Sequence, residues 1–246
     1  MTPKPVIHVG VDDSRRNTGA LEWALRESTL RQEPLQELYV VEEKPARALA
    51  GRATGSRMLV VGRRELGTFR RLLAHSTSEA VAVEAKVPVV IVPEHWMPSD
   101  HAGPVLVALD DSDENAAVIE FAIAEATERQ LPVRFVHVWD LPAMYSWDAM
   151  NVAGVGAEWT ENAERHFENV AAEWRAKHPE ATIQVRVRRG HVVDGVVTAA
   201  EEADAQLLVV GTRHHTRLAS FLLGPVTRGV LHHAPCPLAI VPVARA

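Results

Sequence analysis

The strongest constraint on the fold of this chain is an internal repeat, in which three short apolar blocks occur twice in the same order. Each copy opens with a run that ends in Asp-Asp-Ser, continues with a run that ends in Val-Val-Gly, and closes with a run flanked by prolines. Three matched blocks in one order predict a duplicated domain. The blocks are residues 6–14 and 105–112, residues 58–62 and 207–211, and residues 87–93 and 236–242.

The two copies differ in length. Their first blocks are 98 positions apart and their later blocks 149, so the first copy is 51 residues shorter between its first and second blocks. Because residues 39–49 read like residues 186–196, we expect the first copy to lack the material that matches about residues 130–180, a strand and a long helix. The spacing of the blocks predicts three parts. They are a shortened domain at 1–94, a turn-rich linker at 95–104 and a full-length domain at 105–246.

The apolar runs are four to six residues long and rich in Val, Ile and Leu, which is typical of strands buried on both faces of a parallel sheet. Helical patterns lie between them, and a long loop is expected at residues 141–157. Strands that alternate with helices predict an α/β fold of two tandem, open, doubly wound parallel sheets of Rossmann type, the first one truncated. The expected helices include residues 20–25, 118–125, 163–175 and 196–203.

Composition excludes several classes of protein. The net charge is −6, so the chain has no overall basic field to attract nucleic acid. No run reaches the roughly 18 apolar residues of a membrane helix, and the N-terminal residues do not resemble a signal peptide. Cys236 is the only cysteine, so no disulfide forms within the chain. These features predict a cytoplasmic protein without a membrane or nucleic-acid partner.

The second copy carries an ordered set of short motifs, at residues 107–112, 136–139, 189–191, 207–212, 222–224 and 234–237. By these motifs it resembles a universal stress protein (UspA-like) domain across nearly its whole length, and the first copy resembles one at its beginning and end. The resemblance implies a fold similar to the adenine nucleotide alpha hydrolases. In the ATP-binding branch of the family, the nucleotide lies at the carboxyl ends of the strands, and a loop of pattern Gly-x2-Gly-x9-Gly-Ser/Thr after the fourth strand holds its phosphates.

The resemblance also implies a nucleotide site in the second copy, in altered form. The first and third glycines of the loop are kept, but His214 stands at the second glycine and Pro225 at the hydroxyl residue, so two phosphate donors are lost. ATP or AMP is therefore the expected ligand, held mainly through its adenosine part. Asp110 matches the family aspartate that faces adenine, and Val138 matches the backbone contact to the base. The candidate site residues are Asp110, Val138, Gly211, Arg213, His214, Gly224 and Thr227.

The first copy is not expected to bind nucleotide. Its loop positions are Gly62, Glu65, His75 and Ser76, and Glu65 would place a negative charge where phosphates lie. The second strand, which supplies the adenine contact, is expected to be missing.

Several polar features have simpler structural explanations. We expect each Asp-Asp-Ser to cap the first helix of its copy, because Asp and Ser accept bonds from free helix N–H groups. The arginines at 63, 64, 70 and 71 are interpreted as a solvated helix face. The adjacent histidines at 214–215 and 232–233 point in different directions on a helix, so no metal site is expected.

No catalytic motif emerges from the sequence, neither a nucleophile elbow, a P-loop nor a metalloprotease helix. We therefore interpret the chain as a non-enzymatic stress-response or regulatory protein with a degenerate nucleotide site in its second copy. The alternatives are an ATP-binding switch, a weak ATP-hydrolysing enzyme and a ligand-free scaffold. The last strands of the two copies, residues 89–92 and 238–241, are expected to pair in an intramolecular pseudo-dimer, and a homodimer of whole chains is left open.

Overall fold

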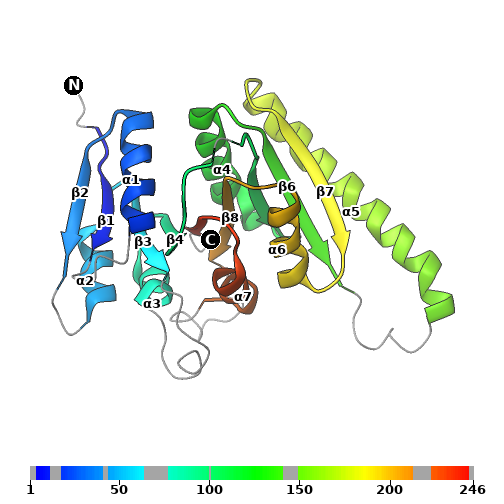
Figure 1. Cartoon of the computed structure of the whole chain (residues 1–246). Coiled ribbons are helices and arrows are strands. Elements are labelled where there is room, and N and C mark those ends of the chain that lie inside the picture. The colour runs from blue at the N-terminus through cyan, green and yellow to red at the C-terminus, as the bar shows by residue number, and fades with distance from the viewer. Residues whose placement is uncertain are drawn as a thin grey trace.

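In the computed structural model, the apolar runs become strands that alternate with helices, as predicted, and the two expected sheets join into one continuous sheet (Figure 1). The structure describes residues 4–11, 18–40, 44–63, 77–99, 101–140, 149–212 and 223–243. Within these residues the spatial order of the strands is β2-β1-β3-β4-β9-β8-β5-β6-β7. The strands are β1 (Ile7–Val11), β2 (Leu35–Tyr39), β3 (Met58–Arg63), β4 (Val89–Pro93), β5 (Val105–Leu109), β6 (Val133–Trp139), β7 (Ile183–Arg189), β8 (Leu207–Thr212) and β9 (Leu238–Pro242).

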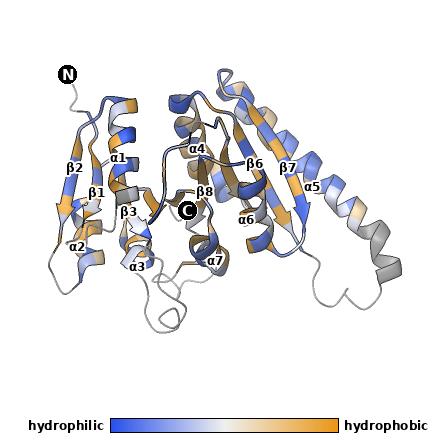
Figure 2. Ribbon diagram, viewed as in Figure 1, coloured by the Kyte–Doolittle hydropathy of each residue, from blue (hydrophilic) through white to orange (hydrophobic). Residues whose placement is uncertain are grey.

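Helices cover both faces of the sheet, because its central strands are apolar on both sides (Figure 2). One buried cluster joins alternate strand residues to α1, α4 and α5, and the other joins the remaining strand residues to α2, α3, α6 and α7. The α/β fold class expected from the sequence is confirmed. The helices are α1 (Thr18–Arg31), α2 (Pro45–Arg52), α3 (Thr77–Glu84), α4 (Ala116–Arg129), α5 (Ala149–Lys177), α6 (Val192–Glu202) and α7 (Pro225–His233), with a short 3₁₀ helix at Asp113–Asn115.

The first half of the sheet, β1 to β4, lacks a different strand from the one expected. β2 is present and pairs with β1 in the register that β6 takes on β5, with Val9 opposite Glu37 and Val107 opposite Phe135. In the second half, β7 is the edge strand next to β6, and α5 precedes it. The described part of the first half contains no strand that corresponds to β7 and no helix that corresponds to α5. The prediction that the second strand is missing was therefore wrong, because β2 is polar and short and escaped a search for apolar runs.

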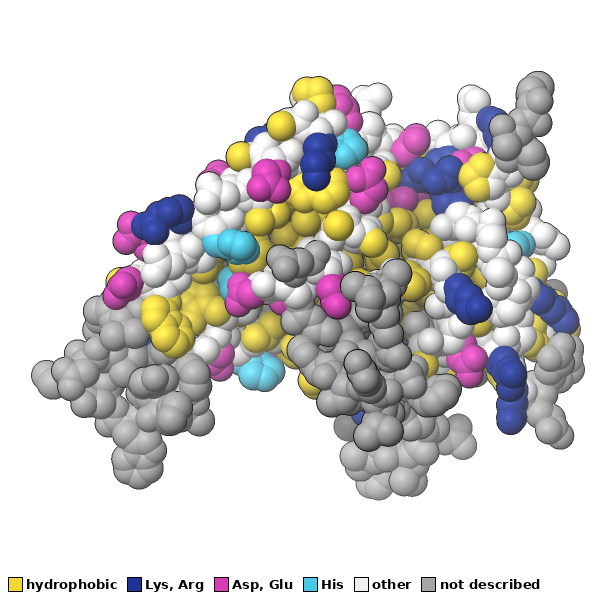
Figure 3. Space-filling view, turned by 180° about the vertical axis from the view of Figure 1, so that it is seen from behind, with side chains coloured by type: hydrophobic (Ala, Val, Ile, Leu, Met, Phe, Trp, Pro, Cys, Tyr) yellow, Lys and Arg dark blue, Asp and Glu magenta, His cyan; other side chains and the backbone are white. Residues whose placement is uncertain are grey.

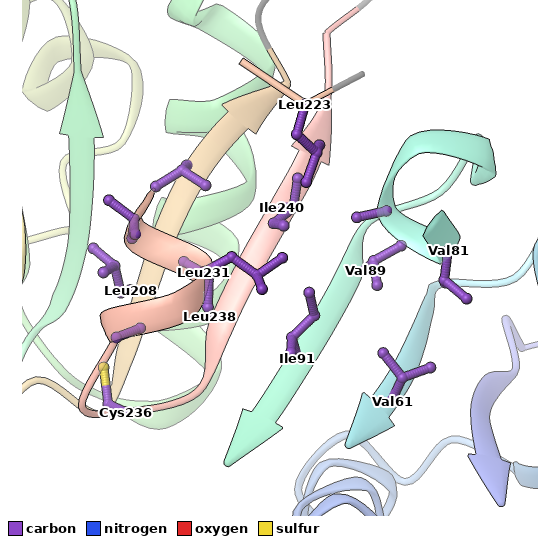
Figure 4. Packing of buried hydrophobic residues seen from close by; sticks show 14 of the residues in the cluster. Val61, Val81, Val89, Ile91, Leu208, Leu223, Leu231, Cys236, Leu238 and Ile240 are labelled. Atoms are coloured by element: carbon purple, nitrogen blue, oxygen red, sulfur yellow. The ribbon is translucent and has the colours of Figure 1, made fainter. Parts of the chain in front are cut away.

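The first half meets the second, β5 to β9, at an antiparallel pair of last strands. Val90 lies opposite Ala239, Val89 opposite Ile240 and Ile91 opposite Leu238 (Figure 4). Residues 90 and 239 are equivalent in the repeat, and the flanking pairs exchange equivalent positions, so the seam has local two-fold symmetry. All other strand pairs of the described sheet are parallel.

A buried group of four charges crosses the same seam between α1 and α4. The Arg31 guanidinium donates to Glu125 at 2.6 Å, and that of Arg129 donates to Glu27. Each arginine also pairs with the glutamate four residues before it in its own helix. Glu27 and Glu125 are equivalent in the repeat, as are Arg31 and Arg129, so the group has the same two-fold symmetry as the strand pair. The four side chains are at most 11% exposed.

The outer helix α5 begins earlier than expected. It runs from Ala149, so the predicted loop at 141–157 is helical from residue 149, and residues 141–148 lie outside the described part. On α5, Arg165 pairs with Glu161 one turn away at 3.1 Å. Figure 3 views the molecule from behind and shows acidic and basic side chains interspersed on this surface. None of the described helices is long and apolar enough to cross a membrane.

Candidate functional site

A cavity of about 390 Å³ lies at the carboxyl ends of β5, β6 and β8, beside the first turn of α7. This is the side of a doubly wound sheet where ligands bind. The cavity brings together five of the seven candidate residues, and the other two, Arg213 and His214, lie outside the described residues. The five are Asp110, Val138, Gly211, Gly224 and Thr227.

Asp110 follows β5 and is held by the turn that it starts. Its Oδ1 accepts hydrogen bonds from the Ser112 backbone N–H at 3.0 Å and from the Ser112 hydroxyl at 2.7 Å. These bonds orient the carboxylate, but they do not cap α4, whose N-cap Asn115 makes no side-chain capping bond. The expected helix-capping role of Asp-Asp-Ser is therefore wrong for the second half, where a 3₁₀ turn intervenes. The equivalent residues of the first half, 12–14, are outside the described part.

Val138 lines the cavity near the end of β6, and α6 comes very close to it. A Cβ built on Gly195 of α6 would stand 2.7 Å from a Val138 methyl group, so only glycine permits this approach. The position of Val138 at the cavity wall therefore depends on a close contact between α6 and β6.

Among the described lining residues, few side-chain donors stand between Gly211 and the first turn of α7. The Thr227 hydroxyl donates to the Gly211 carbonyl at 3.0 Å and so is already used. Pro225 is the first residue of α7 and has no N–H to give. The Thr212 hydroxyl accepts a bond from the Val243 N–H at 3.1 Å.

The charge of the described lining is acidic. Four carboxylates line the cavity, and no lysine or arginine lies among its described lining residues. Carboxylates near a bound phosphate repel it, since like charges in a confined site are costly. The described wall therefore suits a neutral or weakly charged ligand better than a polyphosphate. The four are Asp110, Asp111, Glu114 and Asp140.

Two aromatic residues of β6 line the cavity and were not among the predicted site residues. His137 is 6% exposed, stacks on Phe167 of α5 with ring centroids 4.4 Å apart, and its Nδ1 lies 3.0 Å from the Leu109 carbonyl. Because a carbonyl only accepts, Nδ1 carries the proton and Nε2 is the atom nearer Asp111, at 3.5 Å. Trp139 adds an indole ring beneath the Arg189 guanidinium, 5.7 Å from it. Both lie in the motif at 136–139, but their orientation follows from α5.

In the first half, the region after β3 keeps one hydrogen bond of the cavity region of the second half and differs at the next residue. The Ser78 hydroxyl donates to the Gly62 carbonyl at 3.0 Å, as Thr227 does to Gly211. Arg63, next to Gly62, instead crosses the seam and donates to the carbonyls of Leu231 and Ala234. The interpretation of this arginine as part of a solvated helix face was wrong, because Arg63 ends β3. Residues 64–76, which include Glu65, His75 and Ser76 and the other arginines, lie outside the described part.

Other features of the described chain offer no comparable site. A second cavity of about 550 Å³ lies between α1, the linker and the end of α4, and it contains none of the candidate residues. Within the described residues no group of three or more His, Cys, Asp or Glu could hold a metal ion. Cys236 is buried, and burial raises the pKa of its thiol to about 12, so it is not a nucleophile at neutral pH.

Comparison with known proteins agrees with this architecture. The family model described as Universal stress protein family matches residues 47–93 and 102–242. A universal stress protein of Mycolicibacterium smegmatis is 25% identical over 291 aligned positions, which cover 96% of both chains. Because this chain has only 246 residues, the relative carries residues that this chain lacks. A universal stress protein of Mycobacterium tuberculosis H37Rv is 26% identical over 240 residues, covering 95% of this chain and 81% of its own.

Solved structures show the same fold. A universal stress protein from Archaeoglobus fulgidus superposes with a TM-score of 0.63 at 15% identity, covering 98% of this chain and 97% of its own. A putative universal stress protein from Pseudomonas aeruginosa gives a TM-score of 0.62 at 13% identity, with coverages of 98% and 94%. At these identities the likeness concerns the fold, and the chemistry of the site depends on the residues described above.

Proposed function

Because the chain belongs to the universal stress protein family, we propose that it is a non-enzymatic regulatory protein that binds the adenosine part of a nucleotide in its second half. The observation that carries the proposal is the cavity in which Asp110, Val138 and Gly211 converge at the carboxyl ends of the strands. A cavity of about 390 Å³ is within the range of sites for small organic ligands.

The proposal assigns the two halves different tasks. Residues 105–246 form the ligand-binding domain, residues 1–94 form a shortened domain without a nucleotide, and residues 95–104 connect them. The halves act as an intramolecular pseudo-dimer, which is supported by the two-fold pairing of Val89–Ile91 with Leu238–Ile240 and by the buried charges of α1 and α4.

AMP fits the described wall better than ATP does. The Thr227 hydroxyl already donates to the Gly211 carbonyl, Pro225 has no N–H, and four carboxylates line the cavity. Added phosphates would therefore gain little, and we expect AMP and ATP to bind with similar strength.

A nucleotide-operated switch is the second candidate, and one observation favours it. The N-terminal turn of α7, residues 224–227, lines the cavity, and the N-terminus of a helix attracts negative charge. If this end holds the phosphates, ATP will bind more tightly than AMP. Weak ATP hydrolysis would then be measurable as steady phosphate release.

Calorimetric titration of the whole chain with AMP and then with ATP tests these candidates. Affinities within about tenfold of each other support the adenosine-based site, because tenfold is about 1.4 kcal/mol, less than one charge-assisted phosphate contact contributes. Much tighter ATP binding supports the switch. No heat from either, together with an unchanged melting temperature, contradicts both.

A substitution at Asp110 tests where the ligand lies. Asp110→Asn keeps an oxygen for Ser112 and replaces the other carboxylate oxygen by an N–H donor, so it should weaken AMP binding by about tenfold. The matched control is Glu201→Gln, an exposed carboxylate on α6 that does not line the cavity. Equal affinities of Asp110→Asn and the control would place the ligand elsewhere.

A further inference from the structure

The helix α7 forms part of the cavity wall in the second half, yet residues of the first half hold it. Its first turn, with Gly224, Pro225 and Val226, lines the cavity. Two side chains from the first half contact the rest of the helix, one beside this first turn and one at its last turn.

The contact at the last turn comes from Arg63 at the end of β3. Its guanidinium donates to the Leu231 carbonyl at 2.8 Å and to the Ala234 carbonyl at 2.9 Å. The last carbonyls of a helix have no partner within the helix, and a positive charge there also interacts favourably with the helix dipole. Arg63 therefore caps α7 from across the seam.

The contact beside the first turn joins Glu79 of α3 to Arg228 of α7. The Arg228 Nε lies 3.1 Å from a Glu79 carboxylate oxygen, and the Glu79 side chain is only 5% exposed. Arg228 directly follows Thr227, which lines the cavity and bonds to the Gly211 carbonyl. A change in the position of Arg228 would therefore also displace Thr227, its neighbour in the cavity wall.

Glu79 and Arg228 are equivalent in the repeat, so their ion pair joins α3 and α7 symmetrically, whereas the contact of Arg63 has no described counterpart in the second half. The repeat places Thr212 at the position of Arg63, but the Thr212 hydroxyl bonds to the Val243 N–H within its own half. On its other side α7 packs against α6 so closely that a Cβ on Gly229 would stand 2.7 Å from a Val193 methyl group. Figure 4 shows α7, with Leu231, on the same side of the seam as β9, and β4 across from it.

From these contacts we propose that the shortened first half positions α7, through Arg63 and Glu79, and so sets the shape of the ligand cavity in the second half. Arg63 and Glu79 are positioning residues that do not line the cavity. The part of this inference that concerns ligand affinity rests on the proposed function, whereas the part that concerns α7 does not.

Two measurements on the whole chain separate these parts. Hydrogen exchange without ligand compares α7 with its neighbour α6 in Arg63→Gln and Glu79→Gln, and calorimetry measures AMP affinity in the same variants. We expect exchange to rise in α7 and not in α6, and AMP to bind about threefold more weakly or worse. The matched control is Arg165→Gln, which removes an exposed ion pair with Glu161 on α5 and should change neither readout.

The conservative variant Arg63→Lys keeps the charge and should restore most of the protection of α7. Unchanged exchange in α7, or a rise spread evenly over all helices, would overturn the inference. Faster exchange in α7 with unchanged AMP affinity would overturn its link to the cavity. If the unmodified chain binds neither AMP nor ATP, the proposed function fails, and the exchange measurement alone decides whether the first half holds α7.

Discussion

The second strands of the two halves, β2 and β6, show how a shortened copy can remain stable. In the second half Phe135 faces α5 and is 1% exposed, and His137 stacks on Phe167 of that helix. The first half has neither α5 nor β7 among its described elements, and the equivalent residues are the exposed Glu37 and the half-exposed Tyr39. The charged Glu37 thus replaces a buried phenylalanine on the face that has no covering helix among the described elements.

The opposite face of the same two strands is unchanged in character. Leu38 and Val136 are equivalent and are both buried, because α2 and α6 cover this face in their respective halves. The first half is therefore adapted to its shorter length on one face only. The short edge strand β2 also carries Glu37 at its exposed face, which opposes unwanted strand pairing.

The largest effect is expected when the halves are separated. Residues 1–97 expressed alone should not fold, because isolation exposes β4 and leaves the buried charges of Glu27 and Arg31 without their partners in α4. Circular dichroism and gel filtration measure this. Expression together with residues 98–246 should recover folded protein. A monomeric fragment with a cooperative melting transition would show that the first half is independent.

Exchange of the equivalent residues of β2 and β6 tests the adaptation directly. Phe135→Glu places a charge against α5 and should lower the free energy of unfolding by about 4 kcal/mol or more. Glu37→Phe, on the uncovered face, should change it by no more than about 0.5 kcal/mol and instead promote self-association. Chemical denaturation and light scattering give the two readouts. Similar losses of stability in the two variants would contradict the interpretation that the first half is adapted.

The buried charges of the seam give a comparison in which the halves should behave alike. Arg31→Met and Arg129→Met each leave a buried glutamate with fewer partners and should cost about 3 kcal/mol of unfolding free energy. The exposed pair of Arg165 and Glu161 is the control, because Arg165→Met should cost less than about 1 kcal/mol. A large difference in unfolding free energy between Arg31→Met and Arg129→Met would mean that the two arginines are equivalent in position but not in their contribution to stability.

Much of the architecture could be predicted because the repeat lies in buried strands. Strands such as those that contain Val107 and Val209 are buried on both faces and must be apolar throughout. Their sequences therefore stay recognisable as apolar blocks in both copies. β2 was missed for the opposite reason, since residues that have lost their covering helix no longer form an apolar run. That residues 110, 211 and 224 line one cavity could be predicted, because each lies at the end of a strand or in a glycine motif of the second copy.

Contacts that depend on the seam could not be predicted. Arg63 was interpreted as part of a solvated helix face, and nothing in the sequence singles out Glu79, because their partners Leu231 and Arg228 are 168 and 149 positions away. Glu125 ends the helix predicted at residues 118–125, but its burial beside Arg31 depends on the other half. The direction of His137 likewise depends on Phe167 of a helix that begins earlier than the sequence indicates.

The smallest expected effect concerns pH and one residue at the seam. His232 of α7 occupies the position of the apolar Val83 in the first half, and burial lowers the pKa of its imidazole below the ordinary value of 6.5, although Glu79 opposes the shift. The unfolded chain therefore binds the proton more readily than the folded one. The stability that His232 contributes is complete above its unfolded pKa and falls as the pH drops from about 7 toward the lowered folded pKa.

His232→Gln should remove this part of the pH dependence, so that its melting temperature falls less between pH 7 and pH 5 than that of the unmodified chain. The effect is small because His232 is largely exposed to solvent, which limits its desolvation. The control is His95→Gln, an exposed histidine in the linker segment. Identical pH profiles for His232→Gln and the unmodified chain would mean that the seam does not sense protonation of α7. Arg63 and Glu79 would then hold the helix equally well with His232 in either charge state.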